Sequence, residues 1–258
     1  MNIEQTRLLG SLTRREIRSR FIGSASGWIW LILNPLLLLA VYSFVFGVIF
    51  QARVPPGLDM PFVAWLAVAL WPWLMFSEGV LRGSQAIRNH AALISKVAMP
   101  RELLVLASVA SVFVLHLVGY GAVILVLAVS GVELYWLGLA KALLALATLY
   151  VLTNGLALAL SAIQVYVRDL EQALPTLFMF WFFLTPILYA PSLLPEQYAS
   201  WLDINPMTWW MNEIRAALLH ADAVPGWAAL ALVVGSLAVL CLGTRIFRRL
   251  SPYFEDFL

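Results

Sequence analysis

Few charged residues and a single cysteine set the first limits on this protein. Only 12% of its 258 residues are charged, whereas a soluble domain has about a quarter, and 62% are hydrophobic. A water-soluble core cannot take up so much apolar surface, so lipid must be the solvent for most of the chain. The one cysteine, Cys241, lies in an apolar run and excludes an intramolecular disulfide, which leaves the redox compartment open.

The sequence also lacks common catalytic motifs. It has no G-x-x-x-x-G-K-[ST] phosphate loop, no H-E-x-x-H and no G-x-S-x-G, so we expect no catalytic residues and no ATP hydrolysis through such a loop. His90, His116 and His220 lie far apart without the spacing of metal ligands, so we expect no metal and no cofactor in this chain. The apolar runs contain no row of acids that could relay protons. A chain that moves a solute without an energy site of its own needs a partner.

Six apolar runs are long enough to cross a bilayer. A hydrocarbon core of about 30 Å needs roughly 20 apolar residues in a helix, and backbone groups in lipid must bond within their own segment. The predicted fold class is therefore all-α integral membrane, with six transmembrane helices in one domain of residues 1–258. The predicted spans are residues 28–50, 62–81, 103–130, 134–165, 173–190 and 227–247.

The basic residues predict the orientation. An even number of spans places both termini on one side, and lysine and arginine decide which side that is. Of the 16 basic residues, all but Arg53, Lys141 and Arg215 fall on the side of the termini. We therefore expect both termini and the 83–102 loop in the cytoplasm. Residues 1–20 lack the apolar stretch of a signal peptide, so no cleavage is expected.

Residues 1–24 form a polar, basic segment before the first span. On a helix its arginines and leucines separate onto opposite sides. The arginine stripe is Arg7, Arg14 and Arg18, and the leucine side is Leu8, Leu9 and Leu12. This pattern predicts a helix in the cytoplasmic interface with its arginines toward lipid phosphates. The alternative is an anchor that only sets the topology.

The cytoplasmic segment 83–102 is too long for a simple connection between two helices. Ile87, Ala91 and Ile94 have helical spacing, and Pro100 ends the pattern before the third span. One interpretation is a short amphipathic helix parallel to the membrane, and the other is a solvated loop closed by a proline. The helix would expose Arg88, Asn89 and Lys96.

Charged residues near the ends of other spans have structural interpretations. Asp169 is placed to cap the fifth helix, and Glu171 would lie in its first turn, where the helix dipole favours acids. A role for Arg168 and Asp169 in gating is the alternative. In the second span, Glu78 and Arg82 have the spacing of an intrahelical ion pair.

The outer segment 191–226 is too polar to span the membrane and too apolar to extend freely into water. It predicts two short re-entrant helices that dip into the outer interface, with Asn205-Pro206 as the turn. Glu213 and Arg215 are expected near the outer surface. The tryptophans suited to the headgroup region are Trp201, Trp209 and Trp210.

Aromatic side chains recur on one face of two predicted spans. Rings can stack on the apolar faces of sugars without needing charge, so these faces could line a pore for a sugar polymer. Ordinary helix packing and the interfacial belt are the alternative explanation. The rings are Tyr42, Phe46 and Phe50 in the first span and Phe178, Trp181 and Phe182 in the fifth.

Five motifs follow one another along nearly the whole chain. They are RREIRSRF near the start, LISKVAMPRELLVLA from Leu93 to Ala107, VYVRDLEQALP, FFLTPILY and INPMTWWMNEIRAALL. In this order they resemble the motifs of the membrane subunits of type-2 ABC exporters for bacterial surface polysaccharides, which include O-antigen, capsule and teichoic acid.

The resemblance implies a permease that moves lipid-linked polysaccharide across the bacterial inner membrane. It implies a homodimer with a channel at the interface and two copies of a separate ABC ATPase that bind ATP and Mg. Its other partners are membrane lipids, and no nucleic acid is expected. Segment 83–102 would be the helix that couples to the ATPase. The residues assigned to coupling are Arg88, Asn89, Ile94, Lys96, Pro100, Arg101 and Glu102. Those assigned to the cytoplasmic entrance are Arg14, Arg15, Arg18 and Arg20.

Two other functions stay open at this stage. A type-2 exporter of a drug or small lipid would share the topology and the coupling. An intramembrane enzyme acting on lipid-linked sugars would need acid and base groups at one depth, and the sequence shows none.

Overall fold

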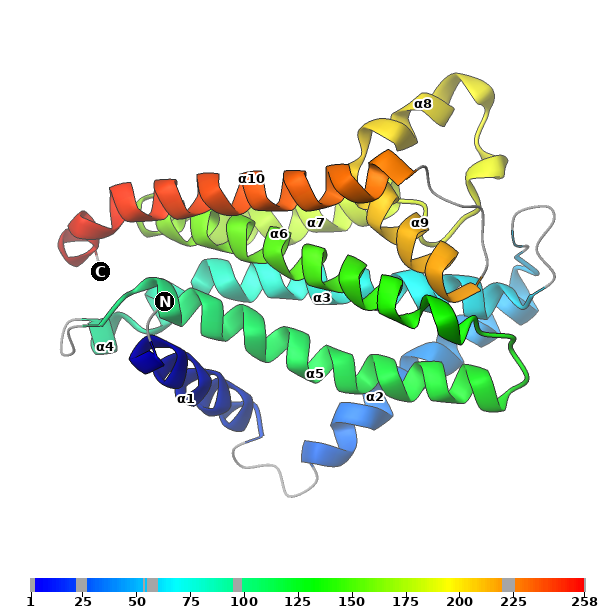
Figure 1. Cartoon of the computed structure of the whole chain (residues 1–258), viewed down its shortest axis with the longest axis horizontal. Helices are drawn as coiled ribbons and strands as arrows, with labels where there is room; N and C mark the ends of the chain where they lie inside the picture. Colours follow the sequence, from blue (N-terminus) through cyan, green and yellow to red (C-terminus); the bar gives the residue numbers. More distant parts are fainter. Residues whose placement is uncertain are drawn as a thin grey trace.

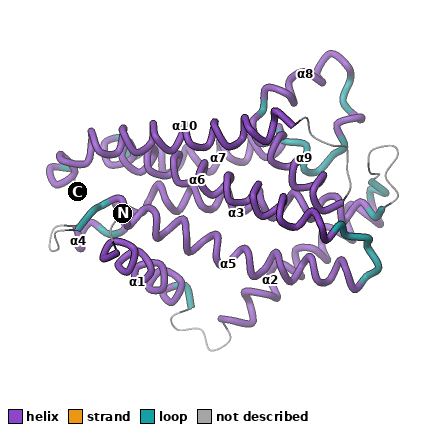
Figure 2. The backbone as a smooth tube through the Cα atoms, viewed as in Figure 1, coloured by secondary structure: helices purple, strands orange, loops and turns teal. Residues whose placement is uncertain are grey.

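The computed structural model describes residues 3–21, 27–52, 54, 60–94, 99–219 and 226–257. Every regular element in these ranges is helical (Figure 2). Leu170–Leu184 is an apolar helix that is shorter than the others. Among the described residues, five stretches are long and apolar enough to span a membrane, namely Ile29–Ile49, Phe62–Asn89, Glu102–Val129, Trp136–Tyr166 and Gly226–Phe254. The prediction of an all-helical membrane protein is therefore confirmed.

The helices follow one another as Figure 1 shows. The N-terminal part has α1 (Ile3–Ser19), α2 (Gly27–Tyr42) with its π-helical continuation η1 (Ser43–Ile49), α3 (Phe62–Asn89) and α4 (Ala91–Ile94). The middle part has α5 (Glu102–Val129), η2 (Trp136–Gly138), α6 (Leu139–Tyr166) and α7 (Leu170–Leu184). The last part has η3 (Pro191–Leu193), α8 (Glu196–Ile204), α9 (Pro206–Leu219), α10 (Gly226–Leu250) and η4 (Ser251–Asp256).

Helix α3 forms the core of the bundle. It is apolar on nearly all sides, and a helix of that kind is stable only when neighbours cover it. Helices α5, α6 and α9 pack against it, and side chains such as Leu66, Trp71 and Phe76 are almost completely buried. The elements that carry the candidate functional residues are therefore arranged around α3.

Helices α6 and α10 lie side by side and approach closely (Figure 1). Gly155 and Gly243 meet where the two backbones are nearest, because a Cβ atom built on Gly243 would lie 2.0 Å from the carbonyl oxygen of Gly155. Small residues at such a contact let backbones pack without intervening side chains, which is how helices commonly associate in lipid.

Helix α2 lies at the periphery and exposes an apolar surface. Pro35 stands inside the helix, and Gly119 of α5 faces it, because a Cβ atom there would lie 2.8 Å from Pro35 Cγ. The exposed side chains of α2 and of its continuation η1 include Ile29, Leu37, Val41, Phe44 and Val48. In a membrane, this face meets lipid or another protein.

The largest differences from the predicted spans are at the ends of two helices. Helix α3 continues past Leu81 to Asn89, so residues 83–89 belong to a helix rather than to a loop. Ala86 and Ile87 are buried there, and that packing holds the helix beyond the apolar run. Helix α7 ends at Leu184 instead of reaching Ala190, because Pro186 has no backbone N–H with which to continue it.

Glu213 and Arg215, which we expected near the outer surface, do not face solvent. Both are buried, with 3% and 2% of their surface exposed. Helix α9 packs against α3 and α6, which turns these side chains inward. Glu213 Oε1 lies 3.0 Å from Lys141 Nζ, whereas the Arg215 guanidinium donates to backbone carbonyls. By contrast, α8 and α9 confirm two short helices with their turn at Asn205.

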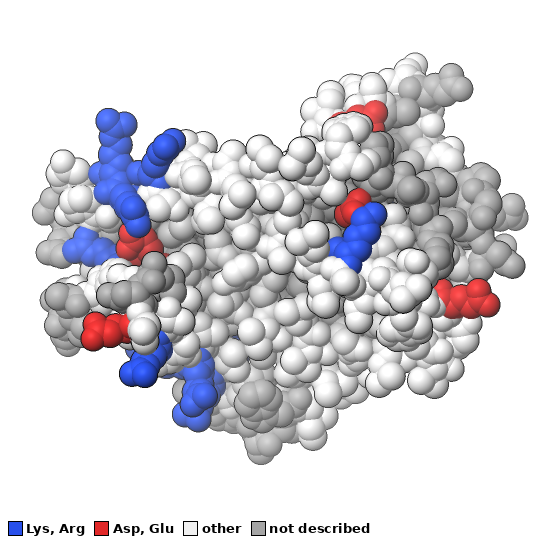
Figure 3. All heavy atoms as spheres, in the orientation of Figure 1, with Lys and Arg blue, Asp and Glu red and all other residues white. Residues whose placement is uncertain are grey.

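On the face that Figure 3 shows, Lys and Arg side chains gather toward one end of the molecule. Both termini lie at this end (Figure 1). A wide band without charged side chains separates this basic end from the charges farther along the same face. The band is what a lipid-facing surface requires.

Candidate functional site

The segment assigned to coupling lies at the basic end of the molecule. Arg88 is in the last turn of α3, α4 follows directly, and Glu102 begins α5. Asn89 and Pro100 are exposed, whereas Ile94 is 6% exposed and packs into the core, so it is not available to a partner surface. Lys96 lies outside the described residues.

Two ion pairs and a hydrogen bond connect this segment to three other elements. Arg88 Nη1 lies 2.5 Å from Glu171 Oε2 in the first turn of α7. Arg101 Nη1 donates to the Ser251 carbonyl in η4, and Glu102 Oε1 accepts a 3.2 Å hydrogen bond from Arg248 Nε. A force applied to this segment would therefore reach α7 and α10 directly.

A Glu16–His90 pair joins α1 to the end of α3. Glu16 Oε1 lies 3.0 Å from His90 Nε2. The hydrogen bond to the Glu16 carboxylate raises the pKa of His90 above its usual 6.5, and the bond to His90 lowers the pKa of Glu16 below 4.5. Each group thus favours the charged form of the other.

Helix α1 packs along α5 and presents two kinds of arginine (Figure 1). Arg14, Arg15 and Arg18, assigned to the cytoplasmic entrance, are exposed. Arg20 turns inward instead, and its guanidinium donates to Glu78 Oε1 at 3.2 Å and to Ser111 Oγ at 3.3 Å. Burial lowers the pKa of Arg20.

Glu78 is the centre of a charged cluster that the sequence revealed only in part. The predicted ion pair with Arg82 is confirmed, with Nε 2.6 Å from Glu78 Oε1. Arg20 shares that oxygen, and His116 Nε2 lies 2.7 Å from Glu78 Oε2. Arg20, Glu78 and His116 line a pocket of about 350 Å³ beside the start of α2. The signal available in the sequence was an acid within an otherwise apolar helix.

The two aromatic stripes assigned to the channel pack within the chain. Phe46 lies between Tyr42 and Phe50 and also contacts Phe62 at the start of α3, with ring centroids 6.0 Å apart. Phe50 is 65% exposed. The assignment of this stripe to a channel stays a prediction.

The second stripe, on α7, faces α3. Phe178, Trp181 and Phe182 surround Trp73, with ring centroids 5.8–6.3 Å away. The opposite face of α7 is exposed and includes Phe180 and Phe183. Should α7 face a channel, these outer rings are better placed to line it than the three that the sequence suggested.

Arg168 and Asp169 lie exposed between α6 and α7. Asp169 occupies the N-cap position of α7, as predicted, but its side chain makes no capping hydrogen bond. Glu171 does lie in the first turn. The choice between a gating and a structural role for Arg168 and Asp169 therefore stays open.

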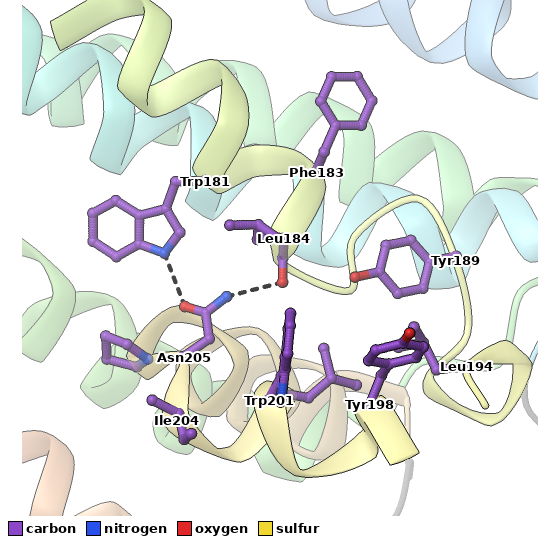
Figure 4. A pocket seen from close by; sticks show the side chains of 11 residues that line it. Trp181, Phe183, Leu184, Tyr189, Leu194, Tyr198, Trp201, Ile204 and Asn205 are labelled. Atoms are coloured by element: carbon purple, nitrogen blue, oxygen red, sulfur yellow. Dashed lines mark hydrogen bonds between the residues drawn. The ribbon is translucent and has the colours of Figure 1, made fainter. Parts of the chain in front are cut away.

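A pocket of about 680 Å³ lies between the end of α7 and α8 (Figure 4). Asn205 joins the α8 side of the pocket to α7, because its Oδ1 accepts a 2.9 Å hydrogen bond from Trp181 Nε1 and its Nδ2 donates to the Leu184 carbonyl. Asn205 Nδ2 also donates to Thr185 Oγ1 at 2.9 Å. No local sequence pattern indicates this pocket, since its walls come from segments on either side of the α7–α8 connection.

Among the described residues, no group of three or more His, Cys, Asp or Glu side chains is arranged to hold a metal ion. The arrangement offers charged contacts at one end, aromatic surfaces along α2 and α7, and an aromatic pocket at the other end. Such a set of surfaces can bind a ligand.

Comparison with known proteins agrees with this picture. A family model described as ABC-2 type transporter matches residues 7–219. The chain is 33% identical over 254 residues to the O-antigen export system permease protein RfbA of Myxococcus xanthus, covering 96% of this chain and 94% of that protein. It is 26% identical over 253 residues to RfbA of Klebsiella pneumoniae, covering 97% and 95%. It is 24% identical over 239 residues to the polysialic acid transport protein KpsM of Escherichia coli, covering 92% and 91%.

The chain therefore belongs to the ABC-2 type transporter family, in which it is a transmembrane permease subunit.

Proposed function

We propose that this chain is the permease of an ATP-driven exporter that moves lipid-linked polysaccharide of the O-antigen or capsule type from the cytoplasm to the periplasm. The similarity to O-antigen permeases over nearly the full length of both chains carries the proposal. An intramembrane enzyme would need an acid and a base that are free to transfer protons. The Glu78 cluster does not offer them, because the Glu78 carboxylate is already bound by three basic side chains.

The proposed topology has six membrane-crossing segments, with α7 as the short fifth. Its 15 residues would cross only part of a bilayer as a straight helix, so the turn after Leu184 and η3 would complete the crossing. Both termini would be cytoplasmic in the bacterial inner membrane. The gathering of Lys and Arg at the end that holds the termini supports this orientation (Figure 3).

The proposed assembly contains two copies of this chain and two copies of an ABC ATPase, which would bind ATP and Mg. The ATPase would press on α4 and the exposed residues beside it, Asn89 and Pro100. Through Arg88 and Glu171, the displacement would pass to α7, whose exposed rings Phe180 and Phe183 would face the channel between the two copies.

Complementation tests this function. The chain and its neighbouring ATPase would be expressed in a strain that lacks its own polysaccharide permease but makes the glycan matched to them. We expect surface polysaccharide to return, the two proteins to copurify and the signal to vanish with a hydrolysis-deficient ATPase. Lys96→Glu should reduce ATP-dependent export several-fold, whereas Arg249→Glu, at an exposed site on α10, should not. Accumulation of glycan in the cytoplasm despite good expression would contradict the proposal.

A further inference from the structure

The aromatic pocket between α7 and α8 lies at the end of the molecule opposite the termini (Figure 1). On the proposed topology, this is the periplasmic side, where an exported chain would emerge. Its volume of about 680 Å³ is in the range of small-ligand sites. The lining residues central to its chemistry are Trp181, Tyr189, Tyr198, Trp201 and Asn205.

The rings around this space present faces and edges to it. Tyr198 and Trp201 are 5.4 Å apart at their centroids and inclined at 76°, so they form two walls of a corner. Figure 4 shows the Tyr189 ring across the space from Trp201, while Phe183 points away. Trp181 and Asn205 hydrogen bond to each other, which fixes the wall beside α7.

Three polar groups on these rings have no partner in the part of the chain that the structure describes. Within the described residues, neither the Tyr189 hydroxyl, nor the Tyr198 hydroxyl, nor the Trp201 indole N–H has a hydrogen-bond partner. The Asn205 amide, in contrast, is fully engaged by Trp181, Leu184 and Thr185. The pocket therefore combines flat apolar faces with free hydrogen-bonding groups.

We propose that this pocket binds a neutral sugar unit of the exported glycan, an inference that rests on the proposed function. The apolar C–H face of a pyranose would stack on Trp201 or Tyr198, and its hydroxyl groups would bond to the free tyrosine hydroxyls and the indole N–H. Among the described residues that line the pocket, none is charged.

The surrounding charges select a neutral sugar over an acidic one. Asp203 is exposed on the same short helix as Tyr198 and Trp201. Arg215 lies on α9, but its guanidinium is buried and bound to the carbonyls of Trp65, Pro186 and Ile187. Among the described residues of the pocket lining and of α8, a polymer of sialic acid would find no cation to pair with, whereas α8 carries the Asp203 carboxylate. A lipid tail would leave all three hydrogen-bonding groups unpaired.

Saturation-transfer difference NMR tests the site on the permease–ATPase complex in lipid nanodiscs. The probes are hexasaccharides of glucose, mannose, galactose and rhamnose, with a sialic acid hexamer as the acidic probe. We expect transfer to the ring C–H protons of at least one neutral probe and at least five-fold less to the acidic one. Trp201→Ala should reduce the neutral signal at least five-fold, and Tyr198→Phe, which keeps the ring, should reduce it about two-fold.

Trp136→Ala is the matched control, since Trp136 is 58% exposed in η2, outside the pocket. It should leave the signal unchanged. Trp201→Phe keeps an aromatic wall. A signal that is kept in Trp201→Phe but lost in Trp201→Ala would be due to loss of the ring and not to failure to fold. Any of three results would overturn the inference: no saturation transfer to any neutral probe, equal transfer to the acidic probe, or the same transfer in Trp201→Ala as in the unaltered protein.

Complementation by the same complex tests the exporter function independently of the sugar site. Polysaccharide export together with silent neutral probes would overturn the sugar site and leave the exporter function standing. Sugar binding that depends on Trp201 in a complex that exports nothing would support the site and count against the exporter function.

Discussion

Arg215 is a buried cation without a carboxylate partner among the described residues. Its Nε donates to the Trp65 carbonyl at 3.1 Å and its Nη1 to the Pro186 carbonyl at 2.8 Å. The guanidinium carbon lies 3.3 Å from the Trp65 ring centroid, so the ring faces the charge. One side chain thereby joins α9 to α3 and to the break after α7.

Replacing Arg215 should destabilise the protein strongly. Arg215→Met would leave buried carbonyls without donors, at a cost of about 1–3 kcal/mol for each group left unsatisfied. We expect a clear fall in the thermal unfolding midpoint, measured by size-exclusion chromatography of heated, detergent-solubilised protein. Arg249→Met, at an exposed position on α10, should have little effect. Equal midpoints for the two variants would show that the Arg215 contacts are not stabilising.

Glu78 should hold α1 against the bundle, because its carboxylate is the shared partner of Arg20, Arg82 and His116. In Glu78→Gln these basic groups lose their counter-charge, and we expect hydrogen exchange in α1 to quicken about ten-fold, which corresponds to about 1.4 kcal/mol. Glu102→Gln is the control, since its partner Arg248 is 72% exposed and such pairs contribute little. Unchanged exchange in Glu78→Gln would assign the attachment of α1 to its apolar contacts alone.

The Glu16–His90 pair should make the attachment of α1 depend on pH. The raised pKa of His90 adds stability that is complete below pH 6.5 and is lost as the pH rises through the raised value. The lowered pKa of Glu16 adds stability that is complete above pH 4.5 and is lost as the pH falls through the lowered value. The pair is therefore strongest from about pH 4.5 to 6.5, although the charge of nearby Arg15 lowers the pKa of His90 somewhat.

Hydrogen exchange of α1 at pH 6 and pH 8, corrected for intrinsic rates, measures this dependence. We expect less protection at pH 8, and His90→Gln should remove most of the difference. Retention of the full difference in His90→Gln would assign the pH dependence to another group.

At the scale of whole elements, the close contact of α6 with α10 depends on two glycines. In Gly243→Ala the new methyl group would lie 2.0 Å from the Gly155 carbonyl oxygen, and a backbone atom cannot move aside as a flexible side chain can. The helices must separate, at a cost of about 1–3 kcal/mol. Gly235→Ala, on the same helix, meets nothing within 4 Å and should be neutral or stabilising. Thermal midpoints compare the two variants, and a lower midpoint for Gly235→Ala would refute this explanation.

The elements themselves could largely be read from the sequence, because lipid demands long apolar helices. The pattern failed where packing rather than hydrophobicity continued a helix, as at the end of α3, and where Pro186 ended α7 early. Within one helix, the spacing of Glu78 and Arg82 was sufficient to predict their ion pair.

Local sequence patterns do not predict contacts between helices that are distant in the chain. Arg20 is 58 positions from Glu78 and His116 is 38 positions from it, and only the folded bundle brings them together. The inward turn of Arg215 likewise follows from the packing of α9 on α3, which no local pattern specifies.

At the scale of the whole molecule, exposed apolar surface alone cannot identify a protein partner, because lipid covers such surface equally well. The aromatic ring that α10 exposes is Trp227 in its first turn, whereas η1 and α7 expose several phenylalanine rings, including Phe44, Phe180 and Phe183. The proposed assembly places these rings between two copies of the chain, whereas α10 would face lipid.

Cysteine cross-linking distinguishes these surfaces, because the chain has only one cysteine to remove. In a Cys241→Ser background, Leu177→Cys on α7 and Val234→Cys on α10 are equally exposed, at 56% each. We expect oxidation in native membranes to link copies through position 177, and the link to weaken when the ATPase hydrolyses ATP and the two α7 helices part. Position 234 should stay monomeric. Cross-linking at position 234 but not at position 177 would place the second copy on α10, and the channel would then have to be sought on that face.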